Sequence, residues 1–178
     1  MADWKASLFG KFNIQWKGLQ IDGIGARKVQ ELLTYLLVFR NHPRELLCET
    51  LWGDQSSVNP RKYLRQTLWR LQSALNAGRD SNEVELRMDD DWLQIKLPGN
   101  FWLDIEEFEN VFNLVKRKRS PELSLHEFTL LEYAVGLYRG NLLEGWYSDW
   151  CVFERERFQT MHLLVTNPAG VGLPYLYQ

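Results

Sequence analysis

The sequence has little of the chemistry that marks a secreted, membrane or metal-binding protein. Only two cysteines occur, Cys48 and Cys151, far apart and each within a helical pattern, which predicts buried, reduced thiols. His42, His126 and His162 are equally scattered, so we predict no metal site and no cofactor. The apolar runs are too short to cross a bilayer, and the first residues lack the regions of a signal peptide. We therefore expect a cytoplasmic protein that does not engage membranes.

Catalytic signatures are also missing. The sequence shows no glycine-rich phosphate loop, no nucleophile elbow and no convergent set of Asp, Glu and His. Cys151 has the acids Asp149 and Glu154 close by in sequence, and their charge disfavours a reactive thiolate. We therefore do not expect an enzyme.

Bulk composition indicates a folded chain whose charge is unevenly distributed. The 178 residues are 45% hydrophobic and 25% charged, which suits two small domains. Residues 1–100 hold 14 Lys and Arg against 12 Asp and Glu, a balance of +2, whereas residues 101–178 hold 7 against 11, a balance of −4. The net charge of −2 therefore hides a difference in sign between the two halves.

The positive charge of the first half is concentrated in one stretch. Residues 55–79 contain no acid, and their cations are Arg61, Lys62, Arg65, Arg70 and Arg79. A local basic stripe is what binding to nucleic-acid phosphates requires, because it displaces condensed counterions. A solvated helix face would carry the same charges, so charge alone leaves both interpretations open.

Periodicity predicts strands and then helices in the first half. Residues 8–21 alternate loosely between glycines, as short antiparallel strands do. From Ala26 an apolar stripe with helical spacing predicts a helix of about 13 residues that ends at Asn41, His42 and Pro43. A second helix is expected at 44–52. Its inward residues are predicted to be Leu46, Leu47, Leu51 and Trp52.

The third predicted helix, residues 60–75, has two chemically different sides. Leu64, Leu68, Leu71 and Leu75 fall on one side, facing the first two helices. The other side carries groups that reach phosphates and base edges in a major groove. Its members are Lys62, Gln66, Trp69 and Ser73, flanked by Arg65 and Arg70. For Trp69, stacking on a sugar or thymine methyl and covering the edge of the core or wing remain equal alternatives.

A hairpin follows the basic helix and completes the order of a winged helix-turn-helix. The alternating runs VELRM and WLQIKL are joined by three aspartates, Asp89, Asp90 and Asp91. Because an acidic tip is unfavourable near phosphate, we expect Arg87 or Lys96 to touch the DNA backbone instead.

The second half predicts antiparallel helices with aromatic seams. Asp104 with Glu107, and Ser124 with Glu127, have capping spacing, the second pair opening a helix that ends at Gly140. A third helix starts at Ser148, with Trp150, Phe153, Phe158 and Met161 on its inner face. The cations at 116–119 fit a role in nucleic-acid binding or compensation of a helix dipole. The predicted fold class is α+β: a winged helix-turn-helix with flanking antiparallel strands, then an all-α, TPR-like helical segment.

Several segments in this order resemble the SARP group of bacterial activators, which join an OmpR-type winged helix to a bacterial transcriptional activation domain. They are LFGKFNI, RKVQELLTYLL, RELLCETLWGD, NPRKYLRQTLWRLQSAL, WLQIKL, WLDIEEFE and LYRGNLLEGWYSDWCVFERERF, spread over residues 7–165. The last is similar to that domain's LYxGxxLxGxxxxWxxxxRxR segment. The resemblance divides the chain into a DNA-binding domain (1–99), a partial activation domain (100–165) and an irregular tail (166–178).

The resemblance implies a transcriptional activator that binds direct repeats of double-stranded DNA as a homodimer and recruits RNA polymerase. The third helix becomes the recognition helix, with Arg61 at its start. The loop of Gly53, Asp54, Gln55, Ser56 and Ser57 resembles the segment that faces polymerase in OmpR-like activators. The turn NHPRELL is about two residues shorter than the family's form and lacks its Ser-type cap, so the second helix is expected to sit differently or start late.

A different class of function fits the same pattern. A winged helix that no longer contacts DNA, followed by helical repeats, would be a protein-interaction module. That interpretation gives Arg65 and Arg70 no role, so salt-dependent DNA binding separates the two hypotheses.

Overall fold

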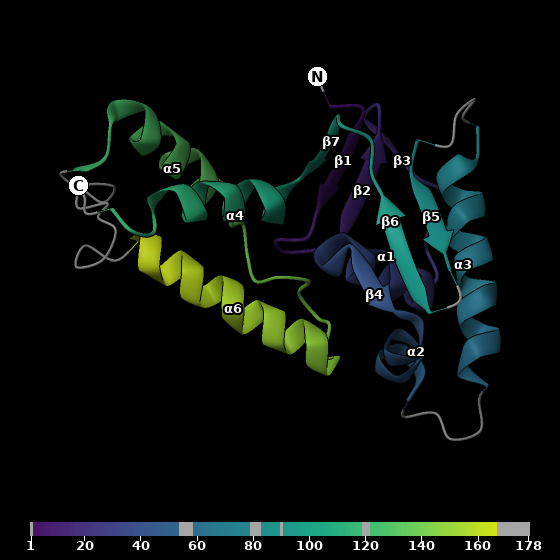
Figure 1. Cartoon of the computed structure of the whole chain (residues 1–178). Coiled ribbons are helices and arrows are strands. Elements are labelled where there is room, and N and C mark those ends of the chain that lie inside the picture. The colour runs from purple at the N-terminus through teal and green to yellow at the C-terminus, as the bar shows by residue number, and fades with distance from the viewer. Residues whose placement is uncertain (1, 54–58, 79–82, 90, 119–121, 167–178) are drawn as a thin grey trace. The chain divides into compact units, whose positions relative to one another are not determined.

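The computed structural model describes residues 2–53, 59–78, 83–89, 91–118 and 122–166 (Figure 1). Residues 54–57 of the expected polymerase-facing loop, Arg79, Asp90, and the expected tail beyond 166 lie outside the described residues. The chain divides into two compact units. We call Gly18–Phe101 the central unit, and Ala2–Lys17 together with the chain from Trp102 onward the helical unit.

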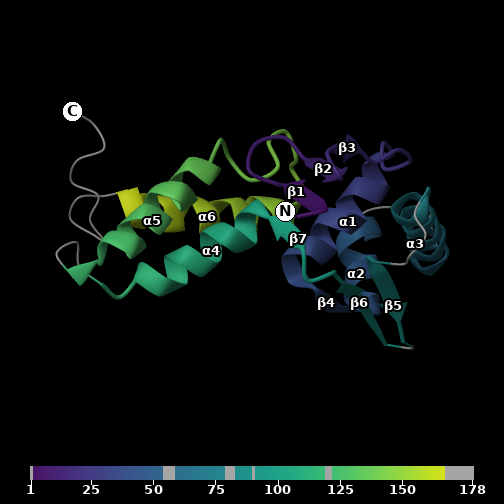
Figure 2. The same cartoon turned by 90° about the horizontal axis from the view of Figure 1, so that it is seen from above.

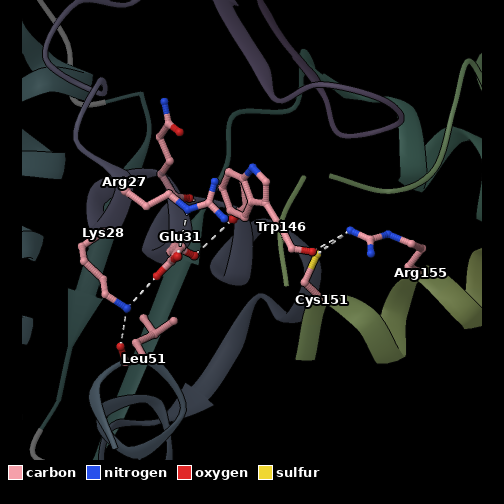
Figure 3. Close-up of polar contacts among 9 residues, drawn as sticks. Arg27, Lys28, Glu31, Leu51, Trp146, Cys151 and Arg155 are labelled. Atoms are coloured by element: carbon pink, nitrogen blue, oxygen red, sulfur yellow. Dashed lines mark hydrogen bonds and ion pairs between the residues drawn. The ribbon is translucent and has the colours of Figure 1, made fainter. Parts of the chain in front are cut away.

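Three helices form the core of the central unit, at the expected positions. They are α1 (Arg27–Phe39), α2 (Arg44–Trp52) and α3 (Pro60–Asn76). The apolar stripe expected on α1 is buried, and α3 packs against both α1 and α2. Lys28 on α1 donates to the Leu51 carbonyl at the end of α2 (2.6 Å) and to Glu31 (2.8 Å), as Figure 3 shows. A cation at the C-terminal end of α2 compensates its dipole and helps fix it against α1.

A three-stranded antiparallel sheet completes the central unit, which also holds the short strand β3 (Leu19–Gln20). Its order is β4 (Asn41–Pro43), β6 (Trp92–Lys96), β5 (Glu85–Met88). The β5–β6 hairpin is the expected wing, but the sequence indicated only a helix end at Asn41–Pro43. There, Arg40 takes a φ of +60° and its carbonyl accepts the N–H of Ile95 (3.0 Å), which turns the chain directly into β4.

α2 begins at Arg44, the predicted position, so the late start that was one expected effect of the shortened turn does not occur. No side chain caps this helix, whose N-cap residue is Pro43. Instead the Arg44 N–H donates to the carbonyl of Asp91 in the wing (2.8 Å), which satisfies one of the donors that a missing cap leaves open. A second prediction was wrong: Leu46, expected to face inward, is 48% exposed.

The helical unit combines an N-terminal hairpin with three helices (Figure 2). Strands β1 (Trp4–Ser7) and β2 (Asn13–Trp16) are antiparallel, and β7 (Phe101–Leu103) lies on the other side of β1. The helices are α4 (Asp104–Val115), α5 (Leu125–Leu137) and α6 (Asp149–Thr166). The first strands thus group with the helices, while the functional division at residue 99 stays a prediction.

Three local predictions in this unit need correction. α5 ends at Leu137 rather than Gly140, and Phe153, expected on the inner face of α6, is 69% exposed. Asp104 does not form a cap pair with Glu107, because its carboxylate is buried and accepts the N–H groups of Leu8, Phe9 and Ile105 at 2.8–2.9 Å. The capping box of Ser124 and Glu127 is confirmed.

The loop before α6 is held by one arginine. Arg155 donates to the carbonyls of Leu142, Leu143 and Trp146 at 2.8–2.9 Å, and Figure 3 shows its contact with Trp146. On its other side the loop pairs with the residues after β1, where the Gly10 N–H donates to the Asn141 carbonyl (2.9 Å). Backbone hydrogen bonds therefore join the loop to the N-terminal segment. No helix in the described residues is long and apolar enough to cross a membrane.

The leucine side of α3 gives a first testable prediction. Leu68 is buried, so Leu68→Ala should lower the free energy of unfolding by about 2 to 5 kcal/mol, measured by urea denaturation with circular dichroism. Arg65→Ala and Arg70→Ala, on the exposed side, should change it by less than about 0.5 kcal/mol. Equal losses in all three variants would contradict this division of the helix.

The buried carboxylate gives a second prediction. Burial raises the pKa of Asp104 to about 6, against the opposing effect of its three N–H donors and of Arg139. Between about pH 4 and 6 the folded protein then holds a proton that the unfolded chain has released, so the free energy of unfolding falls as the pH rises.

Asp104→Asn should remove this slope, as measured by denaturation at several pH values. Burial lowers the pKa of His162, which adds a slope of opposite sign in both proteins, so the difference between wild type and variant isolates Asp104. Identical pH profiles would show that folding leaves the pKa of Asp104 unchanged.

Candidate nucleic-acid interface

Helix α3 is built to present one side to solvent. The Asn59 side chain caps it by accepting the Lys62 N–H (3.2 Å), and Pro60 occupies its first turn. Its inner side is buried as predicted, through Leu64, Leu68, Leu71 and Leu75. Thr67 lies on the same side and is also buried, its hydroxyl donating to the Tyr63 carbonyl (2.8 Å). The rotation of α3 about its axis is therefore fixed by packing.

All the side chains predicted to face DNA from this helix are exposed. Arg61 is among them, and we call the other six the outer face: Lys62, Arg65, Gln66, Trp69, Arg70 and Ser73. Trp69 keeps 72% of its surface exposed, so it does not cover the core or the wing. An exposed indole between cations offers a flat apolar surface where a polar residue would be expected on a solvated helix.

The charges of the outer face are not neutralised within the described residues. Lys62, Arg65 and Arg70 form no ion pair there, and α3 itself contains no acid. Arg61 differs, because its Nε lies 2.9 Å from the Glu45 carboxylate on α2. Like charges at this spacing repel one another, so the outer face is suited to an anionic partner.

Two hollows adjoin the outer face. One, of about 540 Å³, is lined by Arg65, Gln66, Trp69 and Arg70. The second, of about 340 Å³, is lined by Arg44, Arg61, Leu64, Arg65 and Met88, and we call it the arginine hollow. Arg65 forms a wall of both. Sequence reasoning missed Arg44 and Met88, which come from α2 and β5, because only the tertiary fold brings them beside the start of α3.

The side-chain amide of Gln72 hydrogen-bonds the wing to α3. Gln72 donates through Nε2 to the Val84 carbonyl (3.2 Å), and its Oε1 accepts the Leu86 N–H (3.0 Å). This pair of bonds imitates the pairing of a neighbouring strand. Gln72 is half-buried at the margin between the leucines and the exposed residues of α3.

The two predicted wing cations lie apart from α3. Arg87 and Lys96 are exposed, and the β5–β6 register with its alternating burial places them on the face opposite Met88 and Ile95. Arg87 lies 2.9 Å from Glu85, and this hydrogen bond lowers the pKa of the Glu85 carboxyl. The structure therefore gathers the α3 residues but does not bring Arg87 and Lys96 to the same surface.

Other candidate chemistry is sparse in the described residues. They contain no group of three His, Cys, Asp or Glu side chains close enough to hold a metal ion. Cys48 and Cys151 are buried free thiols, as predicted, and burial raises the pKa of Cys48. Of the expected polymerase-facing loop, only Gly53 is described, and it is exposed.

Comparison with known proteins identifies the fold. No family model and no curated protein matches the chain. Among solved structures, the chain is similar to Mycobacterium tuberculosis EmbR in complex with a low-affinity phosphopeptide, with a TM-score of 0.60 and 20% identity over 94% of this chain. The match spans 42% of the EmbR chain. The likeness, together with the helices and sheets described above, confirms the predicted fold class, a winged helix followed by a helical segment.

Proposed function

We propose that this chain is a transcription regulator that binds duplex DNA by placing the outer face of α3 in the major groove. The observation that carries the proposal is that packing exposes three cations of α3 without partners among the described residues. Long cations bind phosphates, and Gln66 and Ser73 beside them can hydrogen-bond to base edges. The fold shared with EmbR supports a regulator of the SARP kind.

The finer parts of the proposal come from the resemblance to SARP activators. They are activation through RNA polymerase, binding to direct repeats and a homodimer on DNA. In this arrangement α1 and α2 support α3. Arg87 and Lys96 lie on the other face of the hairpin from Met88, so they would contact the DNA backbone only beyond the groove that α3 enters, and Arg87 would first have to leave Glu85. The helical unit then serves contacts with other proteins rather than with DNA, in keeping with the acidic balance of residues 101–178.

A salt titration tests the proposal directly. A duplex selected from random DNA should bind so that the logarithm of the association constant falls with the logarithm of salt concentration, with a slope of about −4 to −5. This slope is expected because the central unit should neutralise about four to six phosphates. Fluorescence anisotropy measures this slope. A titration without salt dependence would favour a protein-interaction module instead.

Variants of the outer face sharpen the same test. Arg65→Ala and Arg70→Ala should each weaken binding and reduce the slope by about 1 if the lost contact is to phosphate. Lys11→Ala removes the same charge from an exposed position in the helical unit, and it should leave binding unchanged. Equal effects of all three variants would attribute the salt dependence to overall charge rather than to α3.

Trp69 gives a separate prediction about base recognition. We expect its indole to contact a thymine methyl, because it is the large apolar group on a face that is otherwise polar. Replacing thymines of the selected duplex by deoxyuridine, one at a time, should weaken wild-type binding about fourfold at one position, the value of one buried methyl group.

Trp69→Ala should abolish that sensitivity, which separates the two contacts left open for this residue. If the indole stacks on a sugar instead, the variant will bind more weakly but no deoxyuridine will change the affinity of the wild type.

A further inference from the structure

Three arginines from two helices line the arginine hollow. Arg44 starts α2, whereas Arg61 and Arg65 lie one turn apart on α3. Their side chains line a space of about 340 Å³ whose remaining walls are the apolar Leu64 and Met88. Guanidinium groups bind phosphate oxygens through paired N–H donors, and an apolar wall suits the deoxyribose next to a phosphate.

One carboxylate already interacts with this cluster. Oε1 of Glu45 lies 2.9 Å from Arg61 Nε and 3.9 Å from Arg44 Nη2, so an anionic oxygen has a place between two of the three arginines. The side chain of Glu45 is 64% exposed and is not among the described residues that line the hollow, so it can turn toward solvent. With Glu45 in place, the four groups still carry a net charge of +2.

We propose that the arginine hollow binds one phosphodiester group of the DNA backbone and that Glu45 occupies Arg61 until the duplex arrives. The inference rests on the proposed function, to which it adds a defined phosphate contact. Because Arg65 lines both hollows, the phosphate held by Arg44 and Arg61 lies one side chain away from the surface where Trp69 and Gln66 meet the bases. Seating this phosphate therefore fixes the register of α3 along the groove.

Neutral backbone linkages provide the test. In the selected duplex, each phosphate is replaced in turn by an uncharged methylphosphonate, and binding is measured by anisotropy. One position should weaken wild-type binding about tenfold, the range of a lost charge-assisted hydrogen bond. Arg44→Ala should weaken binding to the unmodified duplex by a similar factor and make the methylphosphonate at that position harmless.

Glu45→Gln provides a variant whose effect cannot come from misfolding. Removing the competing carboxylate should strengthen binding about threefold, on the scale of a surface ion pair. Glu49→Gln makes the same charge change at another exposed position of α2 and should leave affinity unchanged. Equal gains in both variants, or no gain in Glu45→Gln, would overturn the role of Glu45.

The remaining outcomes separate this inference from the proposed function. Loss of all duplex binding in every arm would contradict both. If the duplex binds normally and every methylphosphonate weakens binding equally, only the binding of a phosphate in the arginine hollow would be contradicted. Inorganic phosphate, added at constant ionic strength, should not displace the duplex. If it displaces the duplex from the wild type but not from Arg44→Ala, and the methylphosphonate scan is uniform, the hollow binds a free anion and the proposal is overturned.

Discussion

The row of leucines on α3 is the contact on which the central unit depends. Each of its four side chains is at most 8% exposed, so the helix cannot rotate without bringing apolar surface into water. Deleting part of one such side chain costs about 2 to 5 kcal/mol, a large share of the stability of a small domain. The outward direction of Lys62, Arg65 and Arg70 is therefore a consequence of core packing, and Gln72 gives the wing a fixed place beside the same helix.

Charges on the outer face differ from those in the interior of the helical unit. In the helical unit, Asp104 is surrounded by N–H donors, Arg155 by carbonyls, and Arg157 contacts both Glu109 and Glu154. A buried charge must be satisfied in this way, because desolvation is otherwise too costly. The cations of the outer face have no such partners in the described residues. Like charges at this spacing repel one another and an anionic ligand would relieve that repulsion, so these cations suit a binding role and the paired charges a structural one.

Local sequence predicted much of this fold because most residues in its regular elements are helical. The stripe on α1, the leucines of α3 and the capping box at Ser124 depend on residues within a few turns of one another. Strand β4 could not be found in the same way, because its partner β6 lies about 50 residues further along the chain. Likewise, Asp104 has capping spacing in sequence, but its donors Leu8 and Phe9 come from the other end of the chain.

The candidate site shows the same limit. Periodicity placed the outer face correctly on α3, since its direction follows from the leucines on the same helix. It could not find the arginine hollow, whose walls come from α2, α3 and β5. Nor could it decide the environment of Trp69, because a tryptophan at that phase fits the margin of a core as well as an exposed surface.

In the segment that resembles the activation domain, several residues of the pattern have a role in backbone geometry. Gly140 packs 3.4 Å from the Cα of Gly10, measured from the position that a Cβ would take, and Gly145 has a φ of +80° that favours glycine. Arg155 then satisfies three carbonyls of the loop that contains these glycines. Since the same loop pairs with the residues after β1, the motif also holds the N-terminal hairpin in the helical unit. A fragment of residues 1–99 would contain that hairpin without Asp104 or the loop, both of which hydrogen-bond to it.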